Sequence, residues 1–148
     1  MKIWIINGPN LNMLGIREPG IYGRETYGEL CRRIREHAEA IGAEVTLYQS
    51  NHEGDLVDRI QDAWGQADGI VINPGAYTHT SIAILDALKA VSIPAIEVHI
   101  SDVDAREEFR RVSYIRQACV GTISGHGLDG YLEAMDALAA RAAGGGKA

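Results

Sequence analysis

The chain has 148 residues, 46% of them hydrophobic, and a formal net charge of −6. This length predicts one domain, whose core needs neither disulfides nor metals. The negative charge argues against a nucleic-acid or anionic-membrane surface, so we expect neither kind of partner. The two cysteines lack metal-ligand spacing, and the apolar run at residues 3–6 is far too short for a signal peptide or a membrane span. We therefore expect a reduced, cytoplasmic protein.

Strand-like and helix-like segments alternate along the chain. Apolar runs predict strands at residues 2–7, 44–49, 69–73, 95–101 and 119–123. Apolar residues spaced three or four apart predict helices at residues 25–41, 56–64, 82–93 and 130–141, and residues 142–148 read as a frayed tail. Cys31 is expected in a helix and Cys119 in a strand, and Trp64 should lie on the same helix side as Leu56 and Ile60. This order predicts an α/β fold: a single-domain, flavodoxin-like, doubly wound five-stranded parallel sheet with strand order 2-1-3-4-5.

The connection after the first strand, residues 7–24, is long for a compact domain. It contains four glycines between positions 8 and 23, which favours a mobile flap that carries Arg17 and Tyr22. Pro9 lacks an N–H donor, and the segment has neither a glycine-rich nor a lysine-bearing phosphate motif. These features argue against a flavin or nucleotide site at this loop.

Polar side chains follow three of the predicted strands. Asn73 ends the apolar run 69–73, and the loop behind it, which ends in the helix-capping residue types Thr80 and Ser81, carries Tyr77 and His79. Glu97 and His99 are two residues apart, so they point to the same face of their strand. Because strands 1, 3 and 4 are neighbours in the predicted order, we expect these groups to converge at the crevice where ligands bind.

Several kinds of chemistry fit such a site. Glu97 and His99 could be a buried pair that only satisfies itself. A zinc site from His79, Glu97 and His99 is a weaker alternative, because neither helical H-E-x-x-H nor cysteine spacing is present. No G-x-S-x-G nucleophile motif occurs either. Acid–base chemistry on a small polar anion is favoured, with tyrosine or histidine as the proton carrier and the arginines at 106, 110, 111 and 116 as a local cationic cluster.

Three blocks of sequence resemble the signatures of one family. They are Asn7–Asn12 with Arg17–Pro19 and Ile21–Gly23, then Asn73–Ser81, then Glu97–Ser101 with Ala105–Arg110. Together they resemble the type II 3-dehydroquinate dehydratases over nearly the whole chain. The resemblance implies trans dehydration of 3-dehydroquinate to 3-dehydroshikimate through an enolate, without a cofactor, by a dodecamer built as a tetramer of trimers. It leaves open whether the reaction serves aromatic biosynthesis or quinate breakdown.

The resemblance also assigns roles by position. Tyr22 would be the base, Arg17 would stabilise charge on the flap, and His99 would be the acid. Asn10 would support the enolate, and Glu97 would orient His99. The substrate would be held by Asn73, the backbone of Ile100 and Ser101, His79 and Arg110, with Asp86 reaching in from a neighbouring subunit.

The proposed base has to ionise near neutral pH. A free phenol has a pKa near 10, so ionising it at pH 7 costs about 4 kcal/mol. A nearby cation can lower such a pKa by about 1–3 units. Arg17, five residues from Tyr22, and Arg110 are the candidate cations.

Other interpretations of these residues remain open at this stage. Tyr22 could be a loop tyrosine that packs its ring, and in a monomer Asp86 would be a solvated helix residue. Arg111 and Arg116 are expected to be surface or interface charges. Leu85 and Asp102 depart from the family pattern, which usually has arginine and asparagine there; the first could alter a subunit contact and the second could weaken anion binding. A non-catalytic module that binds a small acid and a flavoprotein are the alternative functions.

Overall fold

The structure, a computed structural model, describes residues 1–144 and contains one five-stranded parallel sheet. Its strands are β1 (Lys2–Asn7), β2 (Glu44–Gln49), β3 (Gly69–Asn73), β4 (Ala95–His99) and β5 (Gly121–Ser124). They pair in the order β2-β1-β3-β4-β5, which confirms the predicted topology. In the register of β1 and β3, Asn7 lies directly beside Asn73. Two polar strand ends are thus neighbours at one edge of the sheet.

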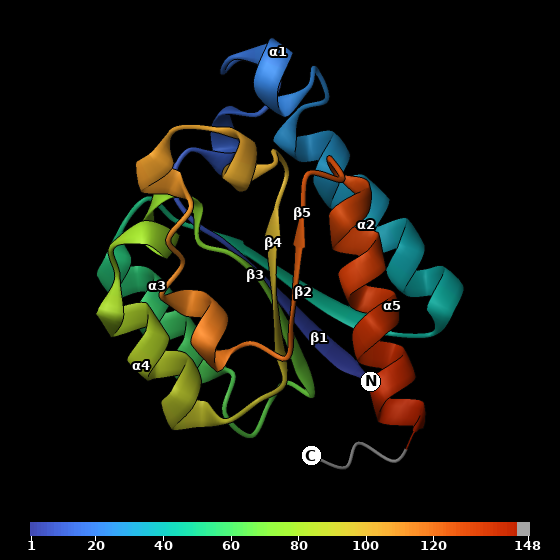
Figure 1. Cartoon of the computed structure of the whole chain (residues 1–148). Helices are drawn as coiled ribbons and strands as arrows, with labels where there is room; N and C mark the ends of the chain where they lie inside the picture. The colour runs from blue at the N-terminus through green and yellow to red at the C-terminus, as the bar shows by residue number, and fades with distance from the viewer. Residues whose placement is uncertain (145–148) are drawn as a thin grey trace.

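Helices cover both faces of the sheet (Figure 1). They are α2 (Tyr27–Ile41), α3 (Glu53–Asp62), α4 (Ile82–Val91) and α5 (Asp129–Ala143), while the short α1 (Pro19–Tyr22) lies outside the two layers. On one face α2 and α5 pack on the sheet through a core cluster that includes Leu30, Ile34 and Met135. On the other face α3 and α4 bury Leu56, Ile60 and Leu88 against Ile70 and Ile72 of β3. Apolar burial on both faces explains why the central strands are continuous hydrophobic runs.

Two helices begin at hydroxyl caps, of which the sequence predicted the one before α4. The Ser81 hydroxyl accepts a hydrogen bond from the Ile84 N–H at 3.0 Å and caps α4, while Thr80 stays outside that role. The Thr26 hydroxyl accepts from the Glu29 N–H at 3.2 Å, so α2 begins at Tyr27, two residues after the predicted start. Each cap satisfies a backbone donor that has no partner inside its helix.

Some sequence predictions are wrong in detail. Trp64 lies beyond the end of α3 and is 72% exposed, because the helix ends at Asp62 and the helical spacing from Leu56 and Ile60 no longer applies to it. Cys119 precedes β5 instead of lying within it, and β4 ends at His99, so Ile100 and Ser101 begin the following loop. The charged segment 102–111, whose sequence predicts a helical turn, forms two short 3-10 turns, η3 (Val103–Ala105) and η4 (Glu108–Arg110). Of the predicted tail, residues 142 and 143 belong to α5, and residues 145–148 lie outside the described residues.

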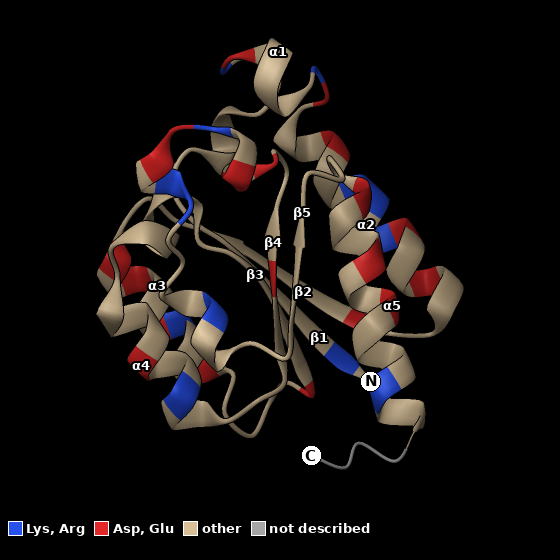
Figure 2. Cartoon of the chain, in the orientation of Figure 1, with Lys and Arg blue, Asp and Glu red and all other residues tan. Residues whose placement is uncertain are grey.

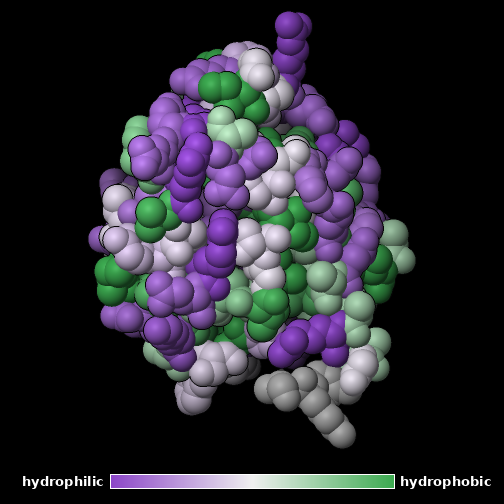
Figure 3. Space-filling view, in the orientation of Figure 1, coloured by the Kyte–Doolittle hydropathy of each residue, from purple (hydrophilic) through white to green (hydrophobic). Residues whose placement is uncertain are grey.

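Charged residues lie on the outer faces of the helices and on the segments beyond the carboxyl ends of the strands (Figure 2). On the face shown in Figure 3, hydrophobic residues occur in small groups among hydrophilic ones. None of the helices in residues 1–144 is both long and apolar enough to cross a membrane. α1 stands beyond the carboxyl ends of β4 and β5 (Figure 1), next to the edge of the sheet where the polar strand ends gather.

Candidate active site

A cavity of about 220 Å³ opens at the carboxyl ends of the strands. Its walls come from the loop after β1, the flap, the loop after β3 and the segment after β4. The lining residues that matter for the chemistry are Asn10, Arg17, Tyr22, Asn73, His79, His99, Ile100, Ser101, Arg106 and Arg110. We call Asn73 at the end of β3 and Glu97 and His99 of β4 the rim, and residues 15–24, none of which is buried, the flap. The flap and the rim therefore meet around one hollow.

The rim holds a buried histidine–carboxylate pair. His99 is 5% exposed, and its Nε2 lies 2.5 Å from Oε2 of Glu97, which is fully buried. A carboxylate can only accept, so Nε2 carries the hydrogen and Nδ1 is the nitrogen left for a ligand. Ile96 and Val98 point to the opposite face, into the core under α2 and α5. The alternation predicted from the sequence is confirmed.

Glu97 is fixed by more than His99. The hydroxyls of Thr78 and Ser113 donate to its Oε2 at 2.7 and 2.8 Å. Nε of Arg116, on η5 (Ile115–Ala118), lies 3.6 Å from Oε1. Burial alone would raise the pKa of the Glu97 carboxyl, but the hydrogen bond and charge of His99 and the two hydroxyls hold it at about 2. Glu97 is therefore a fixed negative charge behind His99, and Arg116, predicted as a surface or interface charge, is 42% exposed and also faces this carboxylate.

Tyr22 is the flap residue that meets a cation. Nη1 of Arg106 donates to the Tyr22 hydroxyl at 2.6 Å and to the Ser101 hydroxyl at 3.3 Å. The guanidinium of Arg17 lies over the same ring, 4.2 Å from its centre. Arg110, which the sequence suggested as the second cation, instead binds Glu107 at 2.8 Å. The cation at the phenol oxygen is Arg106, and a tyrosine that merely packs its ring would not need it.

Asn73 is buried, and both ends of its side-chain amide have hydrogen-bond partners. Its Oδ1 accepts from the Gly75 N–H at 3.1 Å, and its Nδ2 donates to the Tyr131 hydroxyl at 2.9 Å. Asn73 is 4% exposed, yet it lines the cavity. Gly75 has φ of +61°, a conformation that suits glycine, and this turn brings its N–H onto the amide oxygen.

His79, from the loop after β3, and Arg110, from η4, also line the cavity. Nδ1 of His79 donates to the Val112 carbonyl at 2.6 Å, which leaves Nε2 as an acceptor when the ring is neutral. Burial lowers the pKa of His79 and the positive charges of His99 and Arg110 lower it further, against the opposing effect of the Val112 carbonyl. The ring is therefore suited to accept a hydrogen bond from a hydroxyl group at neutral pH.

Two residues of the predicted site lie away from this cavity. Glu97 stands behind His99, as its orienting role requires, while Asp86 is exposed on α4 and does not line the hollow. Leu85 is 5% exposed and packs into the core of this chain. Asp102 caps η3 by accepting from the Asp104 N–H at 3.1 Å and lines a second, neighbouring hollow. Its charge is thus turned away from the main cavity.

Sequence reasoning missed three residues that shape the site: Arg106, Ser113 and Tyr131. Arg106 was predicted only as a member of the cationic cluster, four residues from Arg110 and so on the same side of their turn, and not as the partner of Tyr22. Ser113 and Tyr131 have no local signal, because each reaches a partner far along the chain. In residues 1–144 no three histidine, cysteine or acidic side chains are grouped as metal ligands would be, so the zinc alternative lacks its donor set.

The fold and the cavity together define a class of protein: a flavodoxin-like α/β protein with a phenol, an imidazole and several arginines around one polar hollow. The Dehydroquinase class II family model matches residues 1–139. The chain therefore belongs to the class II dehydroquinase family, which confirms the resemblance seen in the three sequence blocks.

Individual relatives agree with this assignment. The chain is similar to a 3-dehydroquinate dehydratase from Clostridium acetobutylicum, with 54% identity over 138 residues that cover 93% of this chain and 96% of the relative. A crystal structure of the type II dehydroquinase from Butyrivibrio crossotus matches with a TM-score of 0.93 at 57% identity, covering 94% of this chain and 97% of that one. The type II dehydroquinase from Propionibacterium acnes matches with a TM-score of 0.91 at 44% identity, covering 94% and 96%.

Proposed function

We propose that the chain is a lyase that removes water from 3-dehydroquinate to give 3-dehydroshikimate through an enolate. The observation that carries this proposal is the arrangement of Tyr22 and His99 around one cavity, with Arg106 bonded to the phenol and Glu97 bonded to the imidazole. Family membership and relatives that bear the name 3-dehydroquinate dehydratase support it. The binding-module alternative gives no reason for a cation on the phenol oxygen.

Tyr22 acts as the base in this proposal. Its phenolate takes the proton from the carbon next to the ketone, and the electron pair moves onto the ketone oxygen as an enolate. Arg106 and Arg17 stabilise the phenolate through the 2.6 Å hydrogen bond and the guanidinium over the ring. Asn10, which also lines the cavity, supports the enolate oxygen through a water molecule.

His99 acts as the acid. The enolate collapses, the β-hydroxyl leaves with a proton from the imidazolium, and the products are water and an enone. Since Nε2 of His99 is bound to Glu97, Nδ1 delivers this proton. The ionised Glu97 carboxylate orients the ring and stabilises its charged form, which is how a buried carboxylate assists a histidine acid.

The remaining polar groups bind substrate. Asn73 and the backbone of Ile100 and Ser101 hold the carboxylate, while His79 and Arg110 hold ring hydroxyls. His79 is suited to this because its neutral ring offers Nε2 as an acceptor. These assignments explain why the cavity is rich in donors although the chain as a whole is acidic.

The assembly and setting of the enzyme are part of the same proposal. Residues 1–148 form one catalytic domain that needs no cofactor and works in the cytoplasm. Asp86 reaches the cavity of a neighbouring subunit in a dodecamer built from trimers, in line with its exposed position on α4. Sedimentation of the purified protein tests the dodecamer, and Asp86→Ala tests the shared site.

The direct test of the function is to mix purified protein with 3-dehydroquinate and follow the ultraviolet absorbance of the conjugated enone. We expect the absorbance to rise with protein concentration and to stop when substrate is exhausted. A folded oligomer that gives no signal would contradict the lyase and leave the binding module, which isothermal titration with the same acid would then detect.

A further inference from the structure

Tyr131 is a buried tyrosine that the chemistry above does not use. It lies on α5, is fully buried, and places its hydroxyl between the ends of two paired strands. The hydroxyl donates to Oδ1 of Asn7 at 2.6 Å and accepts from Nδ2 of Asn73 at 2.9 Å. These partners are 124 and 58 residues away in sequence but lie side by side in the register of β1 and β3.

The hydrogen bonds around Asn73 can run in one direction only. The Gly75 N–H can only donate, so the atom that faces it must be Oδ1, and Nδ2 must face Tyr131. The phenol oxygen therefore accepts a hydrogen bond from Nδ2 of Asn73 and donates its own hydrogen to Oδ1 of Asn7. Nδ2 of Asn7 in turn points to the Tyr27 hydroxyl at 3.5 Å. Burial raises the pKa of Tyr131, so it keeps this hydrogen across the neutral range.

This direction sets what Asn73 offers to a ligand. Nδ2 carries two hydrogens, and within residues 1–144 it has one acceptor, the Tyr131 hydroxyl. The second N–H remains on a residue that lines the cavity. If the Asn73 amide turned over, Oδ1 would stand where Nδ2 now stands, and this oxygen would repel a carboxylate. The Tyr131 hydroxyl and the Gly75 N–H together hold the amide in the orientation that binds an anion.

We propose that Tyr131 is a positioning residue that sets substrate affinity by holding the Asn73 amide with its N–H toward the cavity. The inference rests on the proposed function, in which Asn73 binds the carboxylate of 3-dehydroquinate. Tyr131 itself touches no reacting atom. Its removal should therefore weaken binding of the acid and leave the proton transfers of Tyr22 and His99 largely intact.

The test compares steady-state kinetics of Tyr131→Phe with the unaltered protein. We expect KM for 3-dehydroquinate to rise about tenfold or more, which is the effect of losing one hydrogen bond to a charged group. We expect kcat to stay within about threefold. Tyr27→Phe, which removes a hydroxyl at the far end of the same network, is the matched control and should change KM by less than about twofold.

A double-mutant cycle separates positioning from general structural damage. In an Asn73→Ala background, Tyr131→Phe should leave KM unchanged, because the amide on which it acts is gone. Fold-changes that multiply would overturn the proposal. A second route is Asn7→Ala, which removes the acceptor of the phenol hydrogen and should raise KM at least threefold through Asn73.

The folding and KM of the single variants also decide whether Tyr131 has a positioning role. An unchanged KM in a folded Tyr131→Phe or Asn7→Ala variant would overturn the positioning role, and so would loss of folding in both, since the hydroxyl would then be a folding determinant. If the unaltered protein turns over 3-dehydroquinate, only this inference is at stake. If it does not, the proposed function fails first.

Discussion

The flap and the rim contribute to the same cavity but are built differently. On the rim, Asn73, Glu97 and His99 are 4%, 0% and 5% exposed, and each has hydrogen-bond partners within the protein. On the flap, α1 contains no buried residue, and the N–H groups of Tyr22 and Gly23 bond to carbonyls only four residues earlier in the same segment. The rim is therefore held in place by the sheet and by buried hydrogen bonds, whereas the flap is positioned by contacts of its side chains.

This difference separates activity from stability. Buried groups with several partners contribute to both, because removing one leaves others unsatisfied. Exposed segments with local hydrogen bonds contribute little to the global free energy of unfolding. Substitutions on the flap should therefore reduce turnover at constant stability, and substitutions on the rim should reduce both. Each variant below tests this difference between the flap and the rim.

The largest effect is expected from Tyr22→Phe on the flap. Removing the base should lower kcat by about 10³-fold, within the range of about 10²–10⁴ that a positioned acid or base contributes. The melting temperature should stay within about 1 °C, because Tyr22 is half-exposed on a locally bonded turn. Enone absorbance and a thermal melt measure the two quantities. Turnover within tenfold of the unaltered protein would contradict the assigned base.

Glu97→Gln on the rim should change both quantities. We expect kcat to fall about 10²-fold, since His99 loses the charge that favours its acid form, and the free energy of unfolding at pH 7 to fall by about 1–3 kcal/mol. The pKa of Glu97 is held at about 2, against an ordinary value of 4.5. Its contribution to stability is therefore complete above about pH 4.5 and is lost as pH falls toward 2.

Urea melts at several pH values check the sign of this effect. The stability difference between the unaltered protein and Glu97→Gln should be largest above pH 5 and should shrink at pH 3. A difference that grows on acidification would show that the carboxyl is not ionised in the folded protein.

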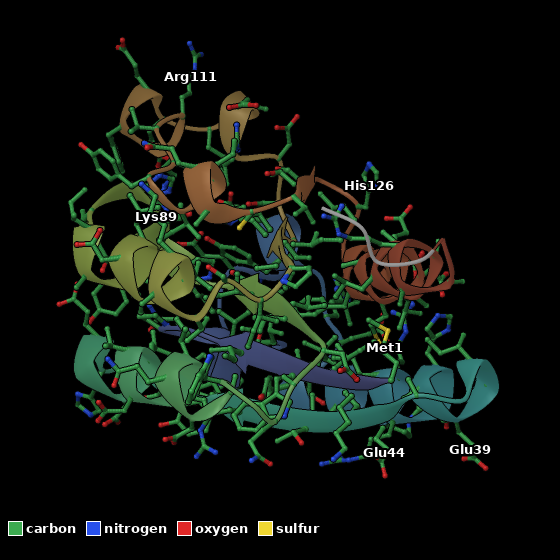
Figure 4. All side chains as sticks on the ribbon, turned by 90° about the horizontal axis from the view of Figure 1, so that it is seen from below. Met1, Glu39, Glu44, Lys89, Arg111 and His126 are labelled. Atoms are coloured by element: carbon green, nitrogen blue, oxygen red, sulfur yellow. The ribbon has the colours of Figure 1, made fainter. Side chains whose placement is uncertain are left out.

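Arg106→Ala tests the contact that joins the two regions. Loss of one charge-assisted hydrogen bond to the Tyr22 phenol should lower kcat about 30-fold with little change in stability, as such bonds contribute about 1.5–3 kcal/mol. Arg111→Ala is the matched control, because Arg111 stands at the outer edge of the molecule (Figure 4). Equal losses in the two variants would mean that general positive charge, and not the phenol contact, matters.

Gly23→Ala should give the smallest effect. Gly23 ends α1 with φ of +85°, and no atom lies within 4 Å of the position of an added Cβ, so the cost is conformational strain alone. We expect kcat to fall about fivefold with an unchanged melting temperature, because the strain, at the lower end of about 1–3 kcal/mol for this glycine-only region of φ and ψ, is confined to the flap. A large drop in melting temperature would show that the flap is part of the cooperative core.

The sequence predicted the rim better than the flap. Apolar runs that switch abruptly to Asn73-Pro74, and the two-residue spacing of Glu97 and His99, are local signals with direct structural consequences, and both are confirmed. The strand order followed from the alternation of strands and helices. Trp64 was misplaced because helical spacing says nothing about where a helix ends.

Contacts between distant segments could not be predicted in this way. Arg106 meets Tyr22 across 84 residues, and Tyr131 meets Asn7 across 124. Neither pair leaves a periodic or motif signal, because the partners are set by how the segment after β4 and the helix α5 fold back over the ends of the strands. Resemblance supplied roles for the residues that match family motifs, but it did not identify these supports.

Deuterium exchange separates the two proton transfers most directly. In D₂O, His99→Ala should incorporate deuterium at the carbon next to the ketone of 3-dehydroquinate faster than buffer alone, because Tyr22 still forms the enolate while loss of the hydroxyl is blocked. Tyr22→Phe should exchange only at the buffer rate. Exchange in Tyr22→Phe as fast as in His99→Ala would contradict the assignment of the base to the flap and the acid to the rim.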